Sequence, residues 1–512
     1  MRDYLTLSLL CSILLTGGAD DLRNDFKKNV AVKQATEDLP MKFTIRGLHL
    51  AYRDQSLTIT EVTRYFLDRI ELLNPELHAV IVVNPKALDI AAQQDASLAR
   101  GEETGPLHGI PILVKDNIET RELPTTAGSL ALKDNFTNRD ADVVARLRAA
   151  GAIILGKTNL SEWANFRSTR SSSGWSAIGG QTRNPYDQSR SPCGSSSGSA
   201  VAVAAKLAIV AIGTETDGSI VCPSSLTGIV GFKPGIGMVS QSGIVPISHT
   251  QDTAGPMARN VEDAAILLSS MISDGETNFA RQLDESALLN KRVGILRSSA
   301  NFHEGVDEVF EKAISTLQKA GAIIVDDIHI KPPKALRQNI NEVLNYEFKH
   351  NINAYLEDLP GELNITSLLG LIEFNQTHED EEMLYFKQEI FLASQAKGPL
   401  TDQAYLDALK NIRRVTRQEG IDKVLLEHRL DVMVAPTAGA AWVIDLVNGD
   451  SWPGGGTSSY PAISGYPHIT IPMGKLHGLP LGMSFIAGED ADAALLSMAY
   501  AFEKEQAEAE KL

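Results

Sequence analysis

The chain has 512 residues, of which 43% are hydrophobic and 22% charged, so it has the composition of an ordinary globular protein with a large core. Its formal net charge of -17 leaves no strongly basic stripe, and this excludes nucleic acid as an expected partner. We therefore expect one large domain or two interleaved domains.

The N-terminus contains an apolar run from Leu5 to Leu15, followed by small residues. A run of this length is too short to span a bilayer, but it is typical of a secretory signal peptide. We predict a signal peptide at 1–19 and an N-terminal segment at 20–44, which implies a periplasmic or secreted protein without stable membrane association. The charged region before the run is weak, because an aspartate follows Arg2, so a cytoplasmic protein remains the alternative.

Beyond this segment, the hydrophobic pattern predicts strands and helices that alternate along most of the chain. Helical spacing occurs at 58–74 and 85–100. Short apolar runs that are typical of strands lie at 79–83, 110–114, 152–155, 208–213, 292–296, 322–326, 430–435, 468–472 and 482–487. This alternation predicts an α/β fold in which helices cover both faces of a central sheet. The chain becomes helix-rich and polar from about 276 to 428, where we expect an insertion.

One segment matches a nucleotide-binding motif letter by letter. Residues 151–158, GAIILGKT, fit the P-loop pattern, in which a glycine-rich loop holds phosphate groups. In a P-loop the four variable residues form a loop after a strand, but residues 152–155 are themselves strand-like and follow a predicted helix. We therefore predict a strand here and no phosphate site.

The histidines and cysteines of the sequence do not form a known metal-binding or cofactor-binding motif. The 11 histidines and 3 cysteines form no His-Glu-x-x-His motif and no paired Cys-x-x-Cys motif, so we expect no metal and no cofactor. Removal of the signal peptide would leave only Cys193 and Cys222, too few for a disulfide framework. We expect each of them to be a buried free thiol.

Two glycine-containing turns present serines. The first, SPCGSSSGS at 191–199, contains Ser195, and the second, TDGS at 216–219, ends at Ser219. Glycine lets the backbone turn sharply, so a serine held there can present its hydroxyl beside main-chain N–H groups. The small apolar residues at 199–213 predict a helix and a buried strand, which argues against a flexible linker. We therefore expect both turns to contribute to one active site.

The base that would activate a serine is not settled by these patterns. A predicted buried strand leads into Lys115, which could be a neutral catalytic lysine or a charged lysine paired with Asp116. A Ser–His–Asp triad also remains open, because His108 or His249 could serve as its base. However, Ser219 does not lie in a G-x-S-x-G motif, so a nucleophile elbow is not indicated.

Taken together, these segments resemble the amidase signature family in order and spacing. The resemblance rests on GIPILVKDN at 109–117, on the serine-rich turn and on GTETDGSI at 213–220. Further similar segments are GIVGFKP at 228–234, DTAGPM at 252–257, VAPT at 434–437 and GYP at 465–467. The resemblance implies an amidase signature fold, with a central mixed sheet, over residues 45–505.

The resemblance also implies a mechanism that uses a Ser–cisSer–Lys triad. Ser219 would attack the amide carbon, and Ser195, preceded by a cis peptide bond, would relay the proton to a neutral Lys115. The reaction would pass through an acyl-enzyme. The oxyanion would be bound by backbone N–H groups of Thr216, Asp217, Gly218 and Ser219.

Within the family, segments 161–166 and 179–186 are most similar to those of bacterial peptide amidases. This similarity implies hydrolysis of the C-terminal amide of a short peptide, with release of ammonia. Many members have an arginine two residues after the nucleophile, where this chain has Val221, and valine cannot hold a substrate carboxylate. The alternatives are a glutaminase-type subunit of a tRNA-dependent amidotransferase and a general aliphatic or aryl amidase.

Overall fold

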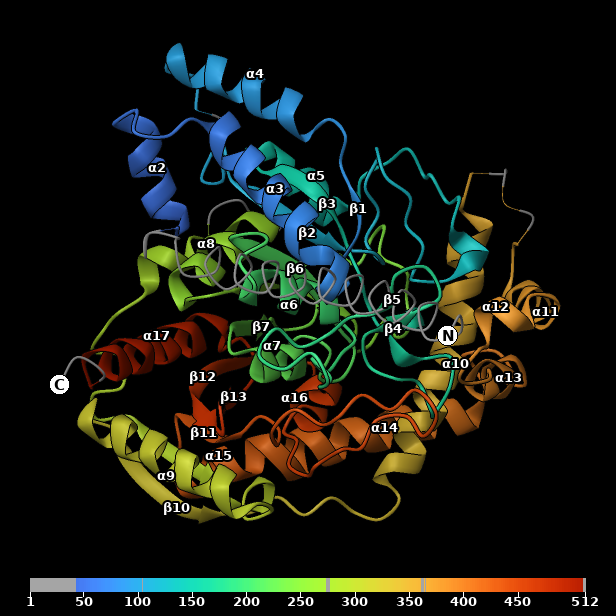
Figure 1. Ribbon diagram of the computed structural model, residues 1–512. Coiled ribbons are helices and arrows are strands. Elements are labelled where there is room, and N and C mark those ends of the chain that lie inside the picture. The colour runs from blue at the N-terminus through green and yellow to red at the C-terminus, as the bar shows by residue number, and fades with distance from the viewer. Residues whose placement is uncertain (1–42, 104, 273–276, 361–362, 364, 510–512) are drawn as a thin grey trace, which may run out of the picture.

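The computed structural model describes residues 43–509, except for 104, 273–276, 361–362 and 364. The predicted signal peptide at 1–19 lies outside the described residues, as does most of the segment at 20–44. The described part is built around one 11-stranded β-sheet with helices packed on it (Figure 1). None of its helices is both long enough and apolar enough to cross a membrane.

The large sheet is mixed, as the sequence predicted. Across the sheet the strands follow the order β1-β3-β2-β6-β8-β7-β12-β13-β11-β9-β10. The neighbours β3, β2 and β6 are parallel, as are β11, β9 and β10, and the central strands are antiparallel. The strands are β1 Val80–Val83, β2 Pro111–Lys115, β3 Ile153–Thr158, β6 Val210–Glu215, β7 Val230–Lys233, β8 Thr253–Ala258, β9 Arg292–Leu296, β10 Ile323–Ile328, β11 Val432–Pro436, β12 His468–Leu476 and β13 Leu479–Ile486.

A two-stranded sheet, β4 Trp175–Ser176 and β5 Gly180–Gln181, lies outside the large one. Each strand predicted from the sequence is present with its ends shifted by a few residues, whereas β4, β5, β7 and β8 were not predicted. The α-helices are α2 Ile45–Arg53, α3 Ile59–Leu77, α4 Ala87–Ala99, α5 Asp142–Ala149, α6 Ser197–Ala204, α7 Val221–Thr227, α8 Val261–Met271, α9 Glu304–Lys319, α10 Leu336–Glu357, α11 Leu368–Thr377, α12 Glu379–Glu382, α13 Glu389–Gln395, α14 Gln403–Thr416, α15 Asp422–His428, α16 Ser459–Ser464 and α17 Asp492–Ala509.

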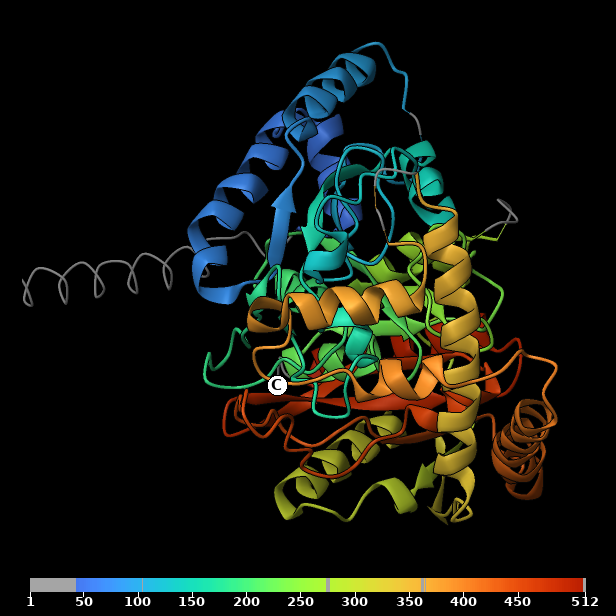
Figure 2. The same cartoon turned by 90° about the vertical axis from the view of Figure 1, so that its right-hand side faces the viewer.

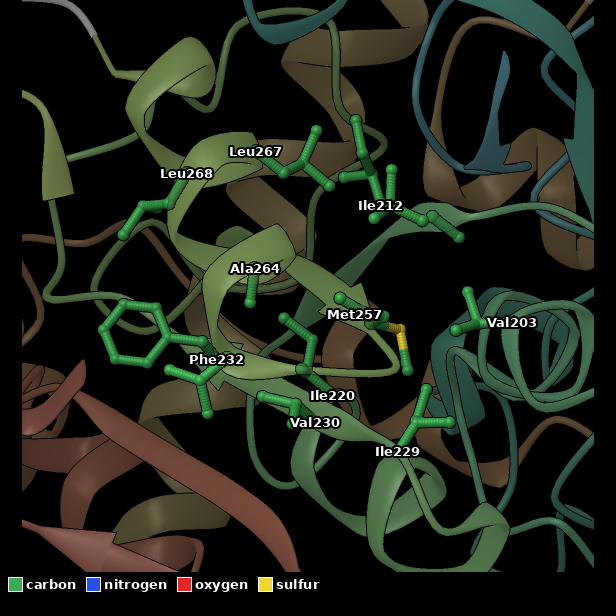
Figure 3. Packing of buried hydrophobic residues seen from close by; sticks show 14 of the residues in the cluster. Val203, Ile212, Ile220, Ile229, Val230, Phe232, Met257, Ala264, Leu267 and Leu268 are labelled. Carbon is green, nitrogen blue, oxygen red and sulfur yellow. The ribbon is translucent and has the colours of Figure 1, made fainter. Parts of the chain in front are cut away.

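Helices cover both faces of the sheet, and small residues in the strands let α6 and α7 approach closely. A Cβ on Gly213 in β6 would lie 2.8 Å from the Oγ of Ser196, just before α6, and one on Gly231 in β7 would lie 2.2 Å from the Oγ of Ser224 in α7. Because side chains alternate along a strand, Phe232 points to the opposite face, where Figure 3 shows it beside α8. The confirmed α/β architecture therefore places α6 and α7 against one face and α8 against the other.

The helix-rich stretch predicted at 276–428 contains α9 to α15, and also β9 and β10, which belong to the large sheet. Helices α10 to α13 gather on one side of the molecule, and α10 runs along most of its height (Figure 2). This side of the molecule supplies part of the cavity described below.

The segment that resembles a P-loop is a strand, as predicted, because β3 includes Ile153 to Thr158. Its lysine, Lys157, is fully buried and forms an ion pair of 2.9 Å with Asp116 at the end of β2. The Lys157 ammonium also donates to the carbonyl of Pro124 and to the hydroxyl of Thr125. Lys157 thus joins neighbouring parts of the fold from within the core.

Candidate active site

The predicted catalytic residues lie together at the carboxyl ends of two neighbouring parallel strands. Strands β2 and β6 are parallel neighbours, so their carboxyl ends lie side by side. Lys115 is the last residue of β2, and the turn that ends at Ser219 follows β6 directly. Ser195 lies just before α6, which packs on β6 and β2. Three segments that are separate in the sequence are therefore adjacent in the fold.

The two serine turns are bonded directly to each other. The backbone N–H of Ser196 donates to the carbonyl oxygen of Ser219 over 3.1 Å. The carbonyl of Ser195 accepts from the N–H of Ser161 at 3.0 Å. The peptide bond between Gly194 and Ser195 is cis, the geometry that the family resemblance implied. These contacts fix the position of Ser195 relative to the turn that carries Ser219.

Lys115 is fully buried and its amine contacts Ser195. Its Nζ lies 2.7 Å from the Oγ of Ser195, and it also contacts the Oγ1 and the carbonyl oxygen of Thr214 at 2.9 and 3.2 Å. Burial lowers the pKa of Lys115 to about 7, although the nearby carboxyl groups of Asp252 and Glu215 oppose the shift. Asp116 pairs with Lys157 instead, so the alternative in which Lys115 pairs with Asp116 is wrong.

The turn that carries Ser219 is shaped by glycine and by a buried carboxylate. Gly218 has a φ of +81°, a conformation that residues with side chains rarely adopt. The Oε2 of Glu215 accepts from the N–H groups of Ile220 and Val221 at 2.8 and 3.1 Å, which anchors the start of α7. Burial raises the pKa of Glu215, and hydrogen bonds from backbone N–H groups, including that of Gly218, oppose this. Ser219 itself is 7% exposed.

The turn also presents donors that could bind an oxyanion. Across the part of the chain that the structure describes, no protein acceptor receives a hydrogen bond from the backbone N–H of Thr216, Asp217 or Ser219. The N–H of Gly218 is directed to the Glu215 carboxylate. Preorganised N–H groups of this kind stabilise negative charge that develops on a carbonyl oxygen.

The two cysteines beside the turns form a disulfide, with an S–S distance of 2.06 Å. Our prediction of two buried free thiols is therefore wrong. The hydrogen bond between Ser196 and Ser219 holds the turns together, and this brings Cys193 and Cys222 to a Cα–Cα distance of 6.0 Å. That distance is suitable for a disulfide. The two cysteines are 29 residues apart in the sequence, so the sequence alone does not show that they are close in space.

The two histidines considered as alternative bases lie elsewhere. A ring nitrogen of His108 contacts the carbonyl of Gln94, and His249 contacts Asn351 and Glu347. In the described residues, no histidine hydrogen-bonds to Ser195 or Ser219, so the Ser–His–Asp alternative is not supported. Within the same residues, no group of three or more His, Cys, Asp or Glu side chains is placed to hold a metal ion.

A cavity of about 740 Å³ lies beside the turn at 216–219, and Asp217 of this turn lines it. Its walls are mainly apolar and come from the start of α10 and from strands β9, β11 and β13, and Gly456, Thr457 and Ser459 also line it. The glycine-rich loop at 452–459 is therefore at the rim of this cavity, whereas residues 166–181 do not line it. The cavity has the size and apolar character of a small-molecule site.

Sequence reasoning did not identify several residues that contact the lysine or shape the turn. Thr214 accepts hydrogen bonds from Lys115 and from the Nδ2 of Asn117, at 2.9 and 3.0 Å. Thr214 and Glu215 lie within GTETDGSI, and Asn117 lies within GIPILVKDN. The motifs therefore marked the right segments, but they did not show which polar side chains point inward.

Comparison with known proteins identifies the family. The family model described as Amidase matches residues 61–496. The native peptide amidase of Stenotrophomonas maltophilia is 45% identical, with a TM-score of 0.86 over 91% of this chain and 97% of that one. A probable amidase of Arabidopsis thaliana is 38% identical over 90% of this chain and 89% of its own length. A subunit of the Glutamyl-tRNA(Gln) amidotransferase of Gloeothece citriformis is 32% identical over 90% of this chain and 97% of its own length. The chain therefore belongs to the amidase signature family, and it is an amidase, an enzyme that hydrolyses carbon–nitrogen amide bonds.

Proposed function

We propose that this amidase hydrolyses the C-terminal carboxamide of short peptides to the acid and ammonia. In this proposal Ser219 is the nucleophile, Ser195 relays the proton and Lys115 is the base. The observation that carries the proposal is the 2.7 Å contact between the buried Lys115 amine and the Oγ of Ser195, which lies next to the turn of Ser219.

The contacts of Lys115 suit a neutral amine that accepts a proton from Ser195. A neutral lysine has two N–H bonds and one lone pair, and Thr214 offers two oxygen atoms to the N–H bonds. The carbonyl of Thr214 can only accept, so one N–H must point to it. With both N–H bonds on Thr214, the lone pair faces the Oγ of Ser195.

The proposed reaction is balanced in protons. As the Ser219 oxygen forms a bond to the amide carbon, its proton passes to Ser195, and the Ser195 proton passes to Lys115. The backbone N–H groups of Thr216, Asp217 and Ser219, which donate to no protein acceptor in the described residues, stabilise the oxyanion. Lys115 then returns its proton through Ser195 to the departing nitrogen, which leaves as ammonia. Water then attacks the acyl-enzyme. Its proton passes through Ser195 to Lys115 and returns to Ser219 when the acid is released.

Three observations support a neutral peptide amide as the substrate. The peptide amidase from Stenotrophomonas is 45% identical over nearly the whole chain, compared with 32% for the amidotransferase protein from Gloeothece. In addition, Val221 offers no positive charge for a substrate carboxylate such as that of glutamine. The large apolar cavity can accept the acyl part of a peptide.

The disulfide supports the predicted export of the protein. Disulfides persist in oxidising compartments and are rare in the cytosol. The pair formed by Cys193 and Cys222 is therefore consistent with a periplasmic or secreted enzyme. Cell fractionation tests this location, since recovery of the uncleaved chain from the cytosol would contradict it.

The substrate proposal is tested by mass spectrometry and ammonia measurement with a panel of compounds. The panel contains an amidated peptide, the same peptide as the free acid, glutamine, a short aliphatic amide and an aryl amide. We expect ammonia from the amidated peptide and no cleavage of internal peptide bonds. Deamidation of glutamine without reaction of the peptide amide would instead support the amidotransferase alternative.

A further inference from the structure

Asp217 presents a carboxylate to the cavity beside the nucleophile turn. We propose that this side chain recognises the N–H of the C-terminal residue of the peptide amide, so that Asp217 determines the preference for peptide amides over simple amides. The inference rests on the proposed function, because it assigns a recognition role within the same site.

The carboxylate of Asp217 is held in place by two serines. The Oγ of Ser458 donates to its Oδ1 at 2.6 Å, and the Oγ of Ser459 donates to its Oδ2 at 2.8 Å. An ionised carboxylate can accept about four hydrogen bonds, so each oxygen keeps capacity for another donor. Desolvation by the surrounding protein raises the pKa of Asp217, and the bonds from both serines and the charge of Lys233 only partly offset this rise.

In the described part of the chain no cation forms an ion pair with Asp217; the buried Lys233 acts on it only through its charge, while its ammonium donates to the carbonyl of Pro234. Asp217 is an exposed residue, and because it lines the cavity it is open to a molecule bound there. The cations that also line the cavity, Lys334 and Arg337, are themselves exposed. A carboxylate on an otherwise mainly apolar wall gains most from a substrate that brings a hydrogen-bond donor.

A second carboxylate, on Glu215 at the end of β6 just before the turn, has a different role and gives a matched comparison. Glu215 points inward and binds the N–H groups of Ile220 and Val221. It does not line the cavity. One carboxylate, on Glu215, therefore supports the backbone of the turn, and another, on Asp217, is open to substrate.

The chemistry of a peptide amide fits this arrangement. In a peptide amide, the carbon attacked by Ser219 is separated from the residue's own N–H by a single atom, the Cα. A donor therefore lies close to the reacting carbonyl, and Asp217 lies two positions before Ser219 in the turn. Simple aliphatic and aryl amides have no such N–H. A site that is built to bind an N–H discriminates against analogues that lack it, because its own polar group is then left unpaired.

The test compares two substrates and three forms of the enzyme. The substrates are N-acetyl-phenylalaninamide and its ketomethylene analogue, in which CH2 replaces the N–H. We measure kcat/KM for ammonia release by the wild type, Asp217→Asn and Glu215→Gln. The wild type should prefer the N–H substrate by about 10- to 100-fold, which is the range for loss of a hydrogen bond to a charged group. Asp217→Asn should reduce the ratio to about a few-fold, because the amide Oδ1 still accepts the N–H but carries no negative charge.

Glu215→Gln is the control, since it should reduce both rates together and keep the preference. Equal rates of the wild type on both substrates would overturn the inference while leaving the proposed function intact, and this comparison needs no variant to fold. If neither substrate nor any amidated peptide reacted, the proposed function itself would fail. A preference that is undiminished in Asp217→Asn, or that falls equally in Glu215→Gln, would also overturn the assignment to Asp217.

Discussion

The proposed proton relay depends on the burial of Lys115, because burial lowers the pKa of its amine. A lysine in water is protonated at neutral pH and cannot take a proton from Ser195. Its surroundings in the core lower the pKa to about 7, so a substantial fraction of the amine is neutral near physiological pH. The contacts with Thr214 then orient the amine toward Ser195.

The pH dependence of activity follows from this pKa. We expect kcat/KM to rise as the pH increases through about 7 and to reach a plateau above it, because only the neutral amine accepts the proton. Below that range the rate should fall about tenfold per pH unit. The measurement is a pH–rate profile with an amidated peptide, with circular dichroism at each pH to verify folding. A flat profile through this range in folded enzyme would contradict a neutral Lys115.

Lys157 shows how one residue type can have opposite roles in the same fold. It is buried like Lys115, but its partner is a carboxylate, Asp116, at 2.9 Å. From the sequence alone, Lys115 and its neighbour Asp116 could have formed the pair. The pairing is decided by the position of β3 beside β2, which places Lys157 next to Asp116. Lys115 then contacts Ser195 and not Asp116. Local sequence contains no information about that contact.

Replacement of Lys157 by methionine should therefore reduce stability strongly. The change leaves the Asp116 carboxylate buried without its ion-pair partner, which typically costs about 3–5 kcal/mol in the free energy of unfolding. Urea denaturation measures the difference. As a control, Lys291→Ala breaks an exposed pair with Asp431 and should cost no more than about 1 kcal/mol. Similar losses for the two variants would refute the structural role of the buried pair.

At the scale of elements, the strands of the large sheet that local sequence failed to predict are β7 and β8, which lie near its centre. β8 contains Gly255 and Pro256, two residue types that are depleted in strands. A Cβ on Gly255 would lie only 2.1 Å from the carbonyl oxygen of Phe232 in β7, so close strand packing requires glycine. Glycine is required at this position because of a contact with another strand, and strand propensities do not include such contacts.

The disulfide joins two elements, the loop before α6 and the helix α7. Both elements lie beside Ser195 and Ser219, and the bridge spans a sequence separation of 29 residues. A cross-link of this loop length stabilises mainly by restricting the unfolded chain. The sequence identified the two cysteines as neighbours of the serine turns, but not that the turns meet.

Cys222→Ser should lower the free energy of unfolding by about 3–4 kcal/mol, as expected for a loop of this length. Urea denaturation of the variant and of the wild type, with and without a reductant, provides the comparison. The reductant should destabilise the wild type and have little effect on the variant. Equal stability of the variant and the oxidised wild type would show that the bridge does not form in solution.

At the scale of the whole molecule, the fold brings together segments that lie 242 residues apart in the sequence. Motifs identified Lys115, Ser195 and Ser219, because each lies in a short, recognisable segment. The cavity could not be predicted in the same way, since its walls come from α10, β9, β11, β13 and the loop before α16. Only the fold shows that Asp217, in the nucleophile turn, contacts Ser458 and Ser459.

The most direct test of the central claim is ammonia release from an amidated peptide by the wild type and by Ser219→Ala, prepared in parallel and shown to be folded. We predict that the wild type releases one ammonia per peptide, leaves internal peptide bonds intact and requires no added metal or cofactor. Ser219→Ala should lose activity by several orders of magnitude, since the residues of a relay act as a unit. Turnover by Ser219→Ala close to that of the wild type, or no ammonia from any amidated peptide with the wild type, would contradict the account.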